Sequence, residues 1–102
     1  MNIIHLEEIN STNDYVKKHM AELEHLTAVH TDRQTAGRGR LERKWIDSGD
    51  ENIFLTIVIK PDLTKNKSYP LTNLTQYLCL ILSMVLEEYG VNPQIKWPND
   101  IL

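Results

Sequence analysis

The sequence predicts a two-layer α/β domain in which strands and helices follow one another along the chain. A length of 102 residues leaves room for one modest domain. Hydrophobic residues make up 41% and charged residues 25% of the chain, a balance typical of a globular rather than a disordered protein. The predicted order is strand, helix, strand, loop, strand, helix, strand. Such a set of strands and helices can form a sheet with helices packed against it.

The N-terminal third predicts a strand, a helix and a second strand. Asn2–Glu8 alternates apolar and polar residues loosely, as a short strand does. Ser11-Thr12-Asn13 precedes apolar residues at helical spacing, which predicts a helix near Thr12–Glu24. Leu26–Thr31 is predicted as the second strand, and Asp32–Ala36 as the polar start of a loop.

The strongest strand signal in the chain is Ile53–Lys60. It is rich in β-branched residues and nearly all apolar, so we expect it to be buried on both faces. Pro61 ends it, because proline has no N–H to give to a central ladder. The polar segments 47–52 and 62–69 are predicted to be loops.

A long helix is predicted from Pro70 or Leu71 to Tyr89. Pro70 suits a first helical turn and Gly90 suits a C-terminal cap. The apolar face of this helix consists of Leu74, Tyr77, Leu78, Ile81, Leu82, Val85 and Leu86. A turn at Asn92-Pro93 then leads into a short strand, Gln94–Trp97.

Composition excludes several classes of protein. The single cysteine, Cys79, rules out a disulfide framework and a cysteine-rich metal site, and it is expected to be a small buried hydrophobe. The four histidines are scattered without metal-ligand spacing, so no metal site is predicted. Neither a signal segment nor an apolar run of about 18 residues is found, which predicts a cytoplasmic protein that does not enter a membrane.

The segment Gly37–Trp45 concentrates positive charge in a chain whose net charge is −3. It contains three arginines and one lysine, and two glycines alternate with the first two arginines. Glycine allows positive φ and a close approach to a ligand, and guanidinium forks suit carboxylate and phosphate oxygens. The pattern predicts a mobile loop that wraps an anion, with Trp45 either covering a flat ring or anchoring the loop. A solvated surface loop or a weak nucleic-acid patch is the alternative interpretation.

Two further features of the pattern limit the interpretation. A dinucleotide-binding fingerprint is rejected, since the third glycine is missing. Ser11-Thr12-Asn13 is explained by helix capping alone, although hydroxyl and amide groups at a helix N-terminus can also meet a polar ligand.

Three motifs together resemble a known family. Gln34–Arg40 with Arg43-Lys44-Trp45 resembles the ligand loop of biotin–protein ligases. Lys96–Asp100 (Lys-Trp-Pro-Asn-Asp) resembles the second signature of that family, and Ser11–Asn13 is similar to its third. The three motifs occur in the same order as in that family and at about the same spacings, and together they span nearly the whole chain. The resemblance implies the class II aminoacyl-tRNA synthetase/biotin ligase fold, in which a mixed sheet carries helices on one side.

The same resemblance implies a reaction and a set of site residues. Biotin and ATP, with Mg²⁺, would give biotinyl-5′-AMP, which a lysine of a biotin carboxyl carrier domain would then attack. The implied catalytic residues are Lys96, Arg38 and Arg40. The implied biotin-binding residues are Ser11, Thr12, Asn13, Gln34, Arg38, Gly39, Arg40 and Lys96, and the implied nucleotide-binding residues are Arg40, Arg43 and Trp45.

The resemblance also implies a domain organisation. Residues 1–102 correspond to the N-terminal half of a ligase catalytic domain. The DNA-binding domain of bifunctional members and the C-terminal β domain are expected to be absent. The acidic net charge further argues against general nucleic-acid binding.

Three other functions stay open at this point. A lipoate–protein ligase shares the reaction logic, although the glycine–arginine loop favours biotin. The chain could instead be a catalytically incomplete module that only binds a ligand or assembles with a partner. A small nucleic-acid-binding domain rests on the basic loop alone.

Self-association is also predicted from the pattern. The Ile53–Lys60 strand is apolar on both faces, and two helices supply little cover for it. Exposed strand edges beside an apolar face favour pairing with another chain. A homo-oligomer is therefore a possible state of the protein.

Overall fold

The computed structural model describes residues 1–46, 51–62 and 73–102, apart from the side chain of Arg40. These residues form two compact units, Met1–Pro61 and Asp62–Leu102, and each unit is described by itself. The predicted loops at 47–52 and 62–69 lie mostly outside the described residues, as do the predicted helix starts at Pro70 and Leu71.

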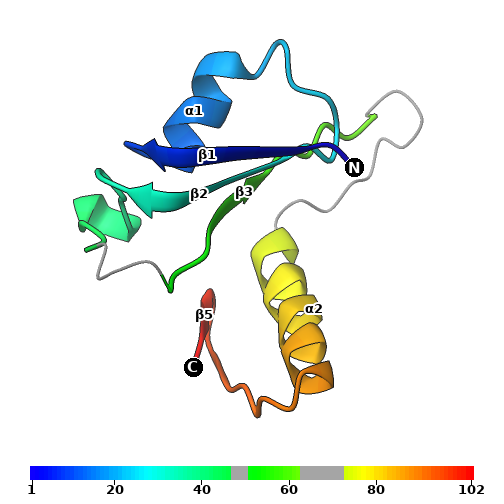
Figure 1. The fold of residues 1–102 in the computed structure, drawn as a ribbon. Coiled ribbons are helices and arrows are strands. Elements are labelled where there is room, and N and C mark those ends of the chain that lie inside the picture. The colour runs from blue at the N-terminus through cyan, green and yellow to red at the C-terminus, as the bar shows by residue number, and fades with distance from the viewer. Residues whose placement is uncertain (47–50, 63–72) are drawn as a thin grey trace. The chain divides into compact units, whose positions relative to one another are not determined.

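The first unit is built on a three-stranded sheet in the order β1-β2-β3 (Figure 1). Strand β1 (Ile3–Ile9) runs parallel to β2 (Ala28–Gln34), and β2 runs antiparallel to β3 (Phe54–Ile57). The register pairs Ile4 with Val29 and Val29 with Thr56. The mixed sheet predicted from the sequence is confirmed.

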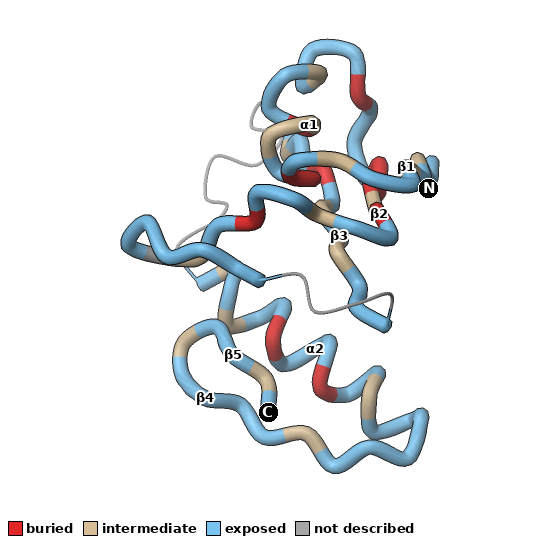
Figure 2. Tube along the Cα trace, turned by 60° about the vertical axis from the view of Figure 1, so that its left-hand side comes forward, coloured by how far each residue is buried: buried red, intermediate tan, exposed pale blue. Residues whose placement is uncertain are grey.

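Helix α1 (Thr12–His19) covers one face of this sheet and closes the core of the unit. The core consists of Val16, Leu23, Val29 and Val58, with Ile4, Leu6 and Tyr15 packed against it. Val29 and Val58 are 0% and 2% exposed, and burial of such a side chain contributes about 1.5–3 kcal/mol. Figure 2 shows the buried positions of this unit gathered along α1 and β2.

Two boundaries in this unit differ from the predictions. The helix ends at His19 rather than Glu24, because the chain turns there: the N–H groups of Glu22 and Leu23 both bond to the His19 carbonyl. This turn brings Leu23 into the core. Strand β2 begins at Ala28 rather than Leu26, since Leu26 adopts a left-handed conformation with φ of 62°.

Strand β2 also extends beyond its predicted end at Thr31. Arg33 pairs with Glu8 and Gln34 pairs with Ile9, so β1 holds this segment in the ladder. The prediction of a loop from Asp32 is therefore wrong for the first three residues. The consequence for function is that Gln34 lies on a strand and not on a loop.

The prediction that the Ile53–Lys60 strand is buried on both faces is wrong. Strand β3 spans four residues, and its residues alternate in burial. Thr56 contacts α1, Val58 is buried in the core and Phe54 is half-buried, whereas Leu55, Ile57 and Ile59 are 49%, 43% and 39% exposed. Within this unit α1 covers one face of the sheet, so the apolar run exceeds what the unit can bury.

The second unit consists of helix α2 (Leu74–Glu88) and a hairpin of β4 (Ile95–Lys96) and β5 (Asp100–Ile101). Gly90 ends the helix as predicted: its φ is 80°, and its N–H bonds to the Glu87 carbonyl while that of Val91 bonds to Leu86. Cys79 is buried, as predicted, and so is Ser83, whose hydroxyl donates to the Cys79 carbonyl at 2.9 Å.

Much of α2 is apolar and exposed. The exposed apolar residues are Tyr77, Leu78, Leu80, Ile81, Leu82, Met84 and Val85. A helix that is apolar around most of its circumference is normally covered by other elements. Helices within the described residues are all too short or too polar to cross a bilayer.

Candidate active site

The first turn of α1 brings three of the predicted site residues together. Ser11 is the N-cap residue, and its hydroxyl accepts the N–H of Asp14 at 3.4 Å, which confirms the capping interpretation. Ser11 and Thr12 are each 4% exposed, while Asn13 is exposed. Asn13 is thus the member of the motif that faces outward.

Gln34, at the end of β2, is joined to this turn. Its Oε1 accepts the backbone N–H of Thr12 at 3.0 Å. The first N–H groups of a helix have no partner inside the helix, so Gln34 satisfies one of them from the neighbouring strand. Because the donor is a backbone N–H, this contact fixes Gln34 with its oxygen toward α1.

Thr56 on β3 completes the cluster and was missed by the sequence analysis. Its hydroxyl donates to Oδ1 of Asn13 at 2.7 Å and lies 2.8 Å from the hydroxyl of Thr12. Thr56 is the single polar residue within the apolar run Ile53–Ile59, and that was the available signal. A polar residue that faces the covered side of a strand requires a hydrogen-bond partner.

The basic segment Gly37–Trp45 forms a short hairpin in this structure. Arg38 and Lys44 form a β-bridge, the N–H of Gly39 bonds to the Arg43 carbonyl, and that of Trp45 to the Gly37 carbonyl. The tip is the 3-10 segment η1 (Arg40–Glu42), in which Leu41 and Glu42 have φ of 57° and 61°. Left-handed conformations strain residues with a β-carbon by about 1–2 kcal/mol each, so the hairpin stores strain at its tip.

The glycines of this hairpin are needed for space rather than for φ. Positive φ occurs at Leu41 and Glu42 and not at Gly37 or Gly39, which corrects the expectation from the sequence. A β-carbon at Gly37 would lie 2.6 Å from Nε2 of Gln34, and one at Gly39 would lie 3.0 Å from Nε1 of Trp45. The two glycines therefore let the first arm of the hairpin pack closely against Gln34 and against Trp45 of the second arm.

Arg38 is directed toward the first turn of α1, where its guanidinium forms an ion pair with Asp14. Asp14 was not predicted as a site residue, although an acidic residue in a first helical turn is favoured by the helix dipole. Arg43 is exposed, and the side chain of Arg40 lies outside the described residues. The guanidinium of Arg38 thus lies beside the polar cluster. In the absence of a ligand, its positive charge is balanced by the carboxylate of Asp14.

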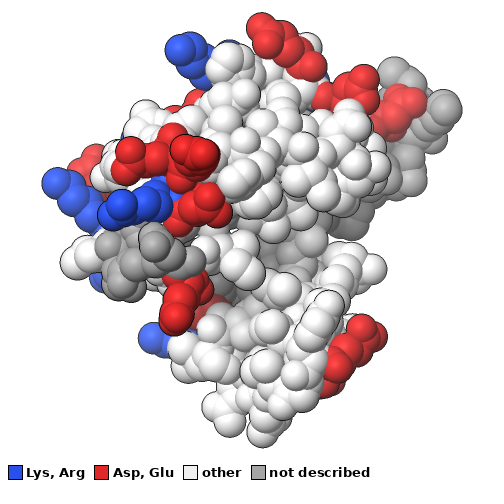
Figure 3. Space-filling model, in the orientation of Figure 1, with Lys and Arg blue, Asp and Glu red and all other residues white. Residues whose placement is uncertain are grey.

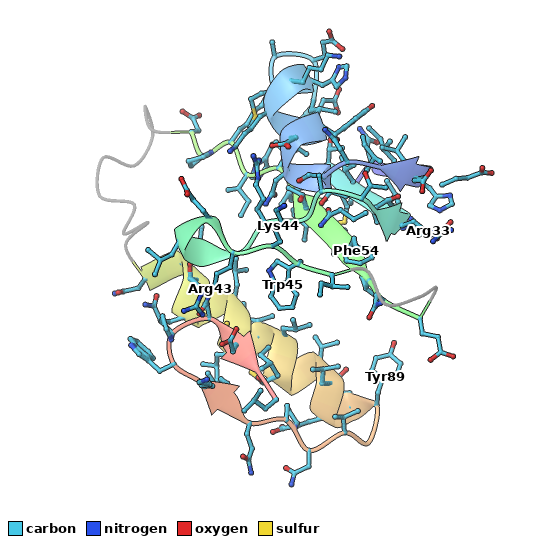
Figure 4. The ribbon with its side chains drawn as sticks, turned by 90° about the vertical axis from the view of Figure 1, so that its left-hand side faces the viewer. Arg33, Arg43, Lys44, Trp45, Phe54 and Tyr89 are labelled. Atoms are coloured by element: carbon cyan, nitrogen blue, oxygen red, sulfur yellow. The ribbon has the colours of Figure 1, made fainter. Side chains whose placement is uncertain are left out.

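A cavity of about 430 Å³ adjoins this arrangement. It is lined by Gln34, Trp45, Ile46, Asn52, Ile53, Phe54 and Leu55. Figure 4 shows Trp45 projecting from the hairpin and Phe54 from β3. The lining combines apolar side chains with the amides of Gln34 and Asn52, and the volume is in the range of small-molecule sites, so the cavity suits a ligand with both apolar and polar parts.

The charges around this region are mixed in sign. Figure 3 shows Lys and Arg side chains interleaved with Asp and Glu on the side of the molecule where β1 and β2 end. Such a surface differs from the continuous basic face expected of a nucleic-acid-binding protein. Among the described residues, no group of three His, Cys, Asp or Glu is placed to hold a metal ion.

The Lys-Trp-Pro-Asn-Asp motif lies in the second unit. Lys96 ends β4, and the turn Trp97–Asn99 leads to Asp100 at the start of β5. Lys96 is exposed and Trp97 is 74% exposed. The hairpin pairing closes this turn, and the carbonyl of the partly buried Pro98 lies 3.9 Å from Sγ of Cys79.

Comparison with known protein families defines the class of this protein. A profile of the biotin/lipoate A/B protein ligase family matches residues 6–102. The chain therefore belongs to this family, and its resemblance to biotin–protein ligases is confirmed.

Individual relatives make the similarity more specific. The chain is 37% identical over 76 residues to the bifunctional ligase/repressor BirA of Bacillus subtilis, an alignment that covers 74% of this chain and 23% of BirA. It is 31% identical over 101 residues to BirA of Salmonella typhimurium, with 98% and 31% covered.

Solved structures agree with these relatives. The biotin protein ligase from Aquifex aeolicus, in complex with biotin and ATP, is 36% identical with a TM-score of 0.81, covering 98% of this chain and 40% of that one. The ligase from Leishmania major in complex with biotin is 32% identical with a TM-score of 0.71, covering 99% and 46%. The chain thus spans less than half the length of these relatives.

Proposed function

We propose that the chain carries out biotin–protein ligation. In the first step a carboxylate oxygen of biotin attacks the α-phosphorus of ATP, and pyrophosphate leaves. In the second step the ε-amine of a lysine on a biotin carboxyl carrier domain attacks the acyl carbon, AMP leaves, and the amine loses a proton. The observation that carries the proposal is the hydrogen-bonded cluster of Thr12, Asn13, Gln34 and Thr56 beside the guanidinium of Arg38.

The polar cluster suits the uncharged end of biotin. Its ureido ring presents a carbonyl acceptor and N–H donors on an otherwise apolar bicycle, which matches a cavity lined by both amides and apolar side chains. This end would be held by Ser11, Thr12, Asn13 and Gln34. The buried residues, Ser11 and Thr12, would act indirectly by packing against the others and orienting them. Gly39 would let the hairpin approach the ligand.

Cations would serve the reacting end. The first step brings an anionic carboxylate against an anionic phosphate, so positive charge must offset their repulsion and the charge that develops on the phosphate oxygens. Arg38, Arg40 and Lys96 would supply that charge, and Arg43 and Trp45 would lie on the nucleotide side. Closure of the hairpin over the anhydride would exclude water.

Magnesium would enter the reaction with ATP. The described residues offer no three-ligand cluster for it, so we assign it no ligands in this chain and no step of its own. Its contribution would be to neutralise phosphate charge, as Mg²⁺ bound mainly to substrate phosphates does in other enzymes.

The proposal is tested by biotin-dependent exchange of labelled pyrophosphate into ATP. We expect exchange with biotin and none with lipoate. Lipoate-dependent exchange alone would instead assign the chain to the lipoate ligases of the same family. Binding of biotinyl-5′-AMP without exchange would favour the alternative of a catalytically incomplete binding or assembly module.

We also propose a homo-oligomeric state. Within the first unit β3 exposes Leu55, Ile57 and Ile59 on one face, and α2 exposes an apolar surface in the second unit. Apolar surface of this kind favours association with another chain. Sedimentation equilibrium at micromolar concentrations checks this: a monomer whose unfolding does not depend on concentration would contradict it.

A further inference from the structure

The hydroxyl of Thr56 occupies a position that determines the direction of neighbouring hydrogen bonds. Oδ1 of Asn13 can only accept, so the hydroxyl of Thr56 donates to it, at 2.7 Å. A hydroxyl has one hydrogen, so in the 2.8 Å contact between the two threonines Thr12 is the donor, and its longer contact of 3.4 Å with Oε1 of Gln34 shares the same hydrogen. The Thr12 hydroxyl therefore donates to Thr56, and the Thr56 hydroxyl donates to Asn13.

This order fixes how two amides are presented. Asn13 is exposed and its oxygen is engaged by Thr56, so its NH₂ group is the part that faces outward. Gln34 is fixed in the same sense, because its Oε1 accepts the N–H of Thr12, and Thr12 is itself held by Thr56. Its Nε2 lies on the side of Gly37, toward the hairpin. Both amides therefore turn their donor side away from α1.

We infer that Thr56 is a positioning residue that makes this end of the site select a ligand with a carbonyl acceptor, an inference that rests on the proposed function. Biotin offers such a group in its ureido ring. The dithiolane ring of lipoate has only sulfur atoms, which are weak acceptors. Loss of the Thr56 hydroxyl leaves Asn13 free to rotate its amide and leaves the Thr12 hydroxyl with its longer contact to Oε1 of Gln34, so discrimination between the two acids falls.

Two substitutions and one control separate positioning from simple stabilisation. Thr56→Val keeps the shape of the side chain and removes the hydroxyl, while Thr56→Ser restores it. Thr31→Val is the matched control, because Thr31 is buried on the neighbouring strand and donates to the Arg33 carbonyl rather than to α1. Calorimetric titrations of the whole chain use biotin, desthiobiotin (which keeps the ureido carbonyl) and lipoate.

We expect Thr56→Val to weaken binding of biotin and desthiobiotin by the same factor, about tenfold, and to leave the affinity for lipoate unchanged. Thr56→Ser and Thr31→Val should stay within about twofold of the unaltered chain. Unchanged biotin binding by Thr56→Val, equal losses for biotin and lipoate, or failure of the serine variant to restore binding would each overturn the inference.

A second measurement needs no ligand. Side-chain amide NMR signals of Asn13 should shift in Thr56→Val and return in Thr56→Ser. If the unaltered chain binds no biotin, the proposed function is contradicted, and the role of Thr56 is decided by these signals alone. Asn13 signals that are unchanged in Thr56→Val would show that Thr56 does not orient the amide.

Discussion

The two units of the chain differ in how completely they bury their apolar residues. In the first unit a helix packs on a sheet, and Val29 and Val58 are almost fully buried. Among the described residues of the second unit, a hairpin of two short strands lies beside α2, and Leu82 is 51% exposed. A rigid polar site requires a packed scaffold. The geometry of the Thr12, Asn13 and Gln34 cluster is therefore set within its own unit, whereas Lys96 lies in a unit whose described apolar residues are less completely buried.

The largest expected effect tests this difference in packing. Val29→Ala should lower the free energy of unfolding by about 2–4 kcal/mol, because it opens a cavity in the core of the first unit. Leu82→Ala in α2 should cost only about 0.5 kcal/mol in the monomer, at protein concentrations below those at which the chain associates, because the side chain is 51% exposed. Urea unfolding of both variants is the measurement, and equal losses would show that α2 is covered in solution.

The next effect concerns charge in the hairpin. Arg40→Ala should slow adenylate formation roughly 10- to 100-fold, since a charge-assisted contact contributes about 1.5–3 kcal/mol, and should leave the melting temperature unchanged. Arg33→Ala is the control, because Arg33 is exposed on β2 and outside the hairpin. A marked fall in thermal stability of Arg40→Ala would mean that Arg40 is structural, contrary to its proposed role.

Glycine substitutions in the two units should have opposite consequences. Gly37→Ala would press on Nε2 of Gln34, so biotin affinity should fall about tenfold with little change in stability. Gly90→Ala meets no neighbouring atom but must adopt φ of 80°, so it should cost about 1 kcal/mol of stability and leave biotin binding intact. Calorimetric titrations and thermal melts of both variants distinguish the two effects. Weakened biotin binding in Gly90→Ala would contradict the assignment of the biotin-binding residues to the first unit.

The smallest effect concerns the ion pair between Asp14 and Arg38. Both side chains are partly exposed, so Asp14→Asn should change stability by less than about 1 kcal/mol. Because Asp14 competes with an anionic ligand for Arg38, the variant should bind biotinyl-5′-AMP slightly more tightly at low salt. Titrations at two salt concentrations check this, and weaker binding would show that Asp14 positions Arg38 for the ligand.

The sequence predicted those features that depend on local patterns. Ser11 caps α1, Gly90 caps α2, and β1 lies within one residue of its predicted position, because capping and alternation are encoded by neighbouring residues. The failures depend on tertiary contacts. Strand β2 extends to Gln34 because β1 pairs with it. Strand β3 is exposed on one face because, within its unit, α1 packs against the other face.

The candidate site shows the same division. Motif residues Thr12, Asn13 and Gln34 were identified from the sequence, and the structure brings them together. Thr56 and Asp14 were missed, because their importance comes from partners 43 and 24 positions away along the chain. Spacing in the sequence gives no indication of which residues face each other across a strand and a helix.

The central proposal is that the first unit holds the part of a biotin ligase site that binds the ureido end of biotin. Calorimetric titration of the unaltered chain with biotinyl-5′-AMP tests it most directly, with Gln34→Leu as the variant that removes the amide beside Thr12. We predict saturable binding at one site per chain and a loss of at least about tenfold in the variant. Absence of saturable heat in the unaltered chain, or equal affinity in Gln34→Leu, would contradict the claim.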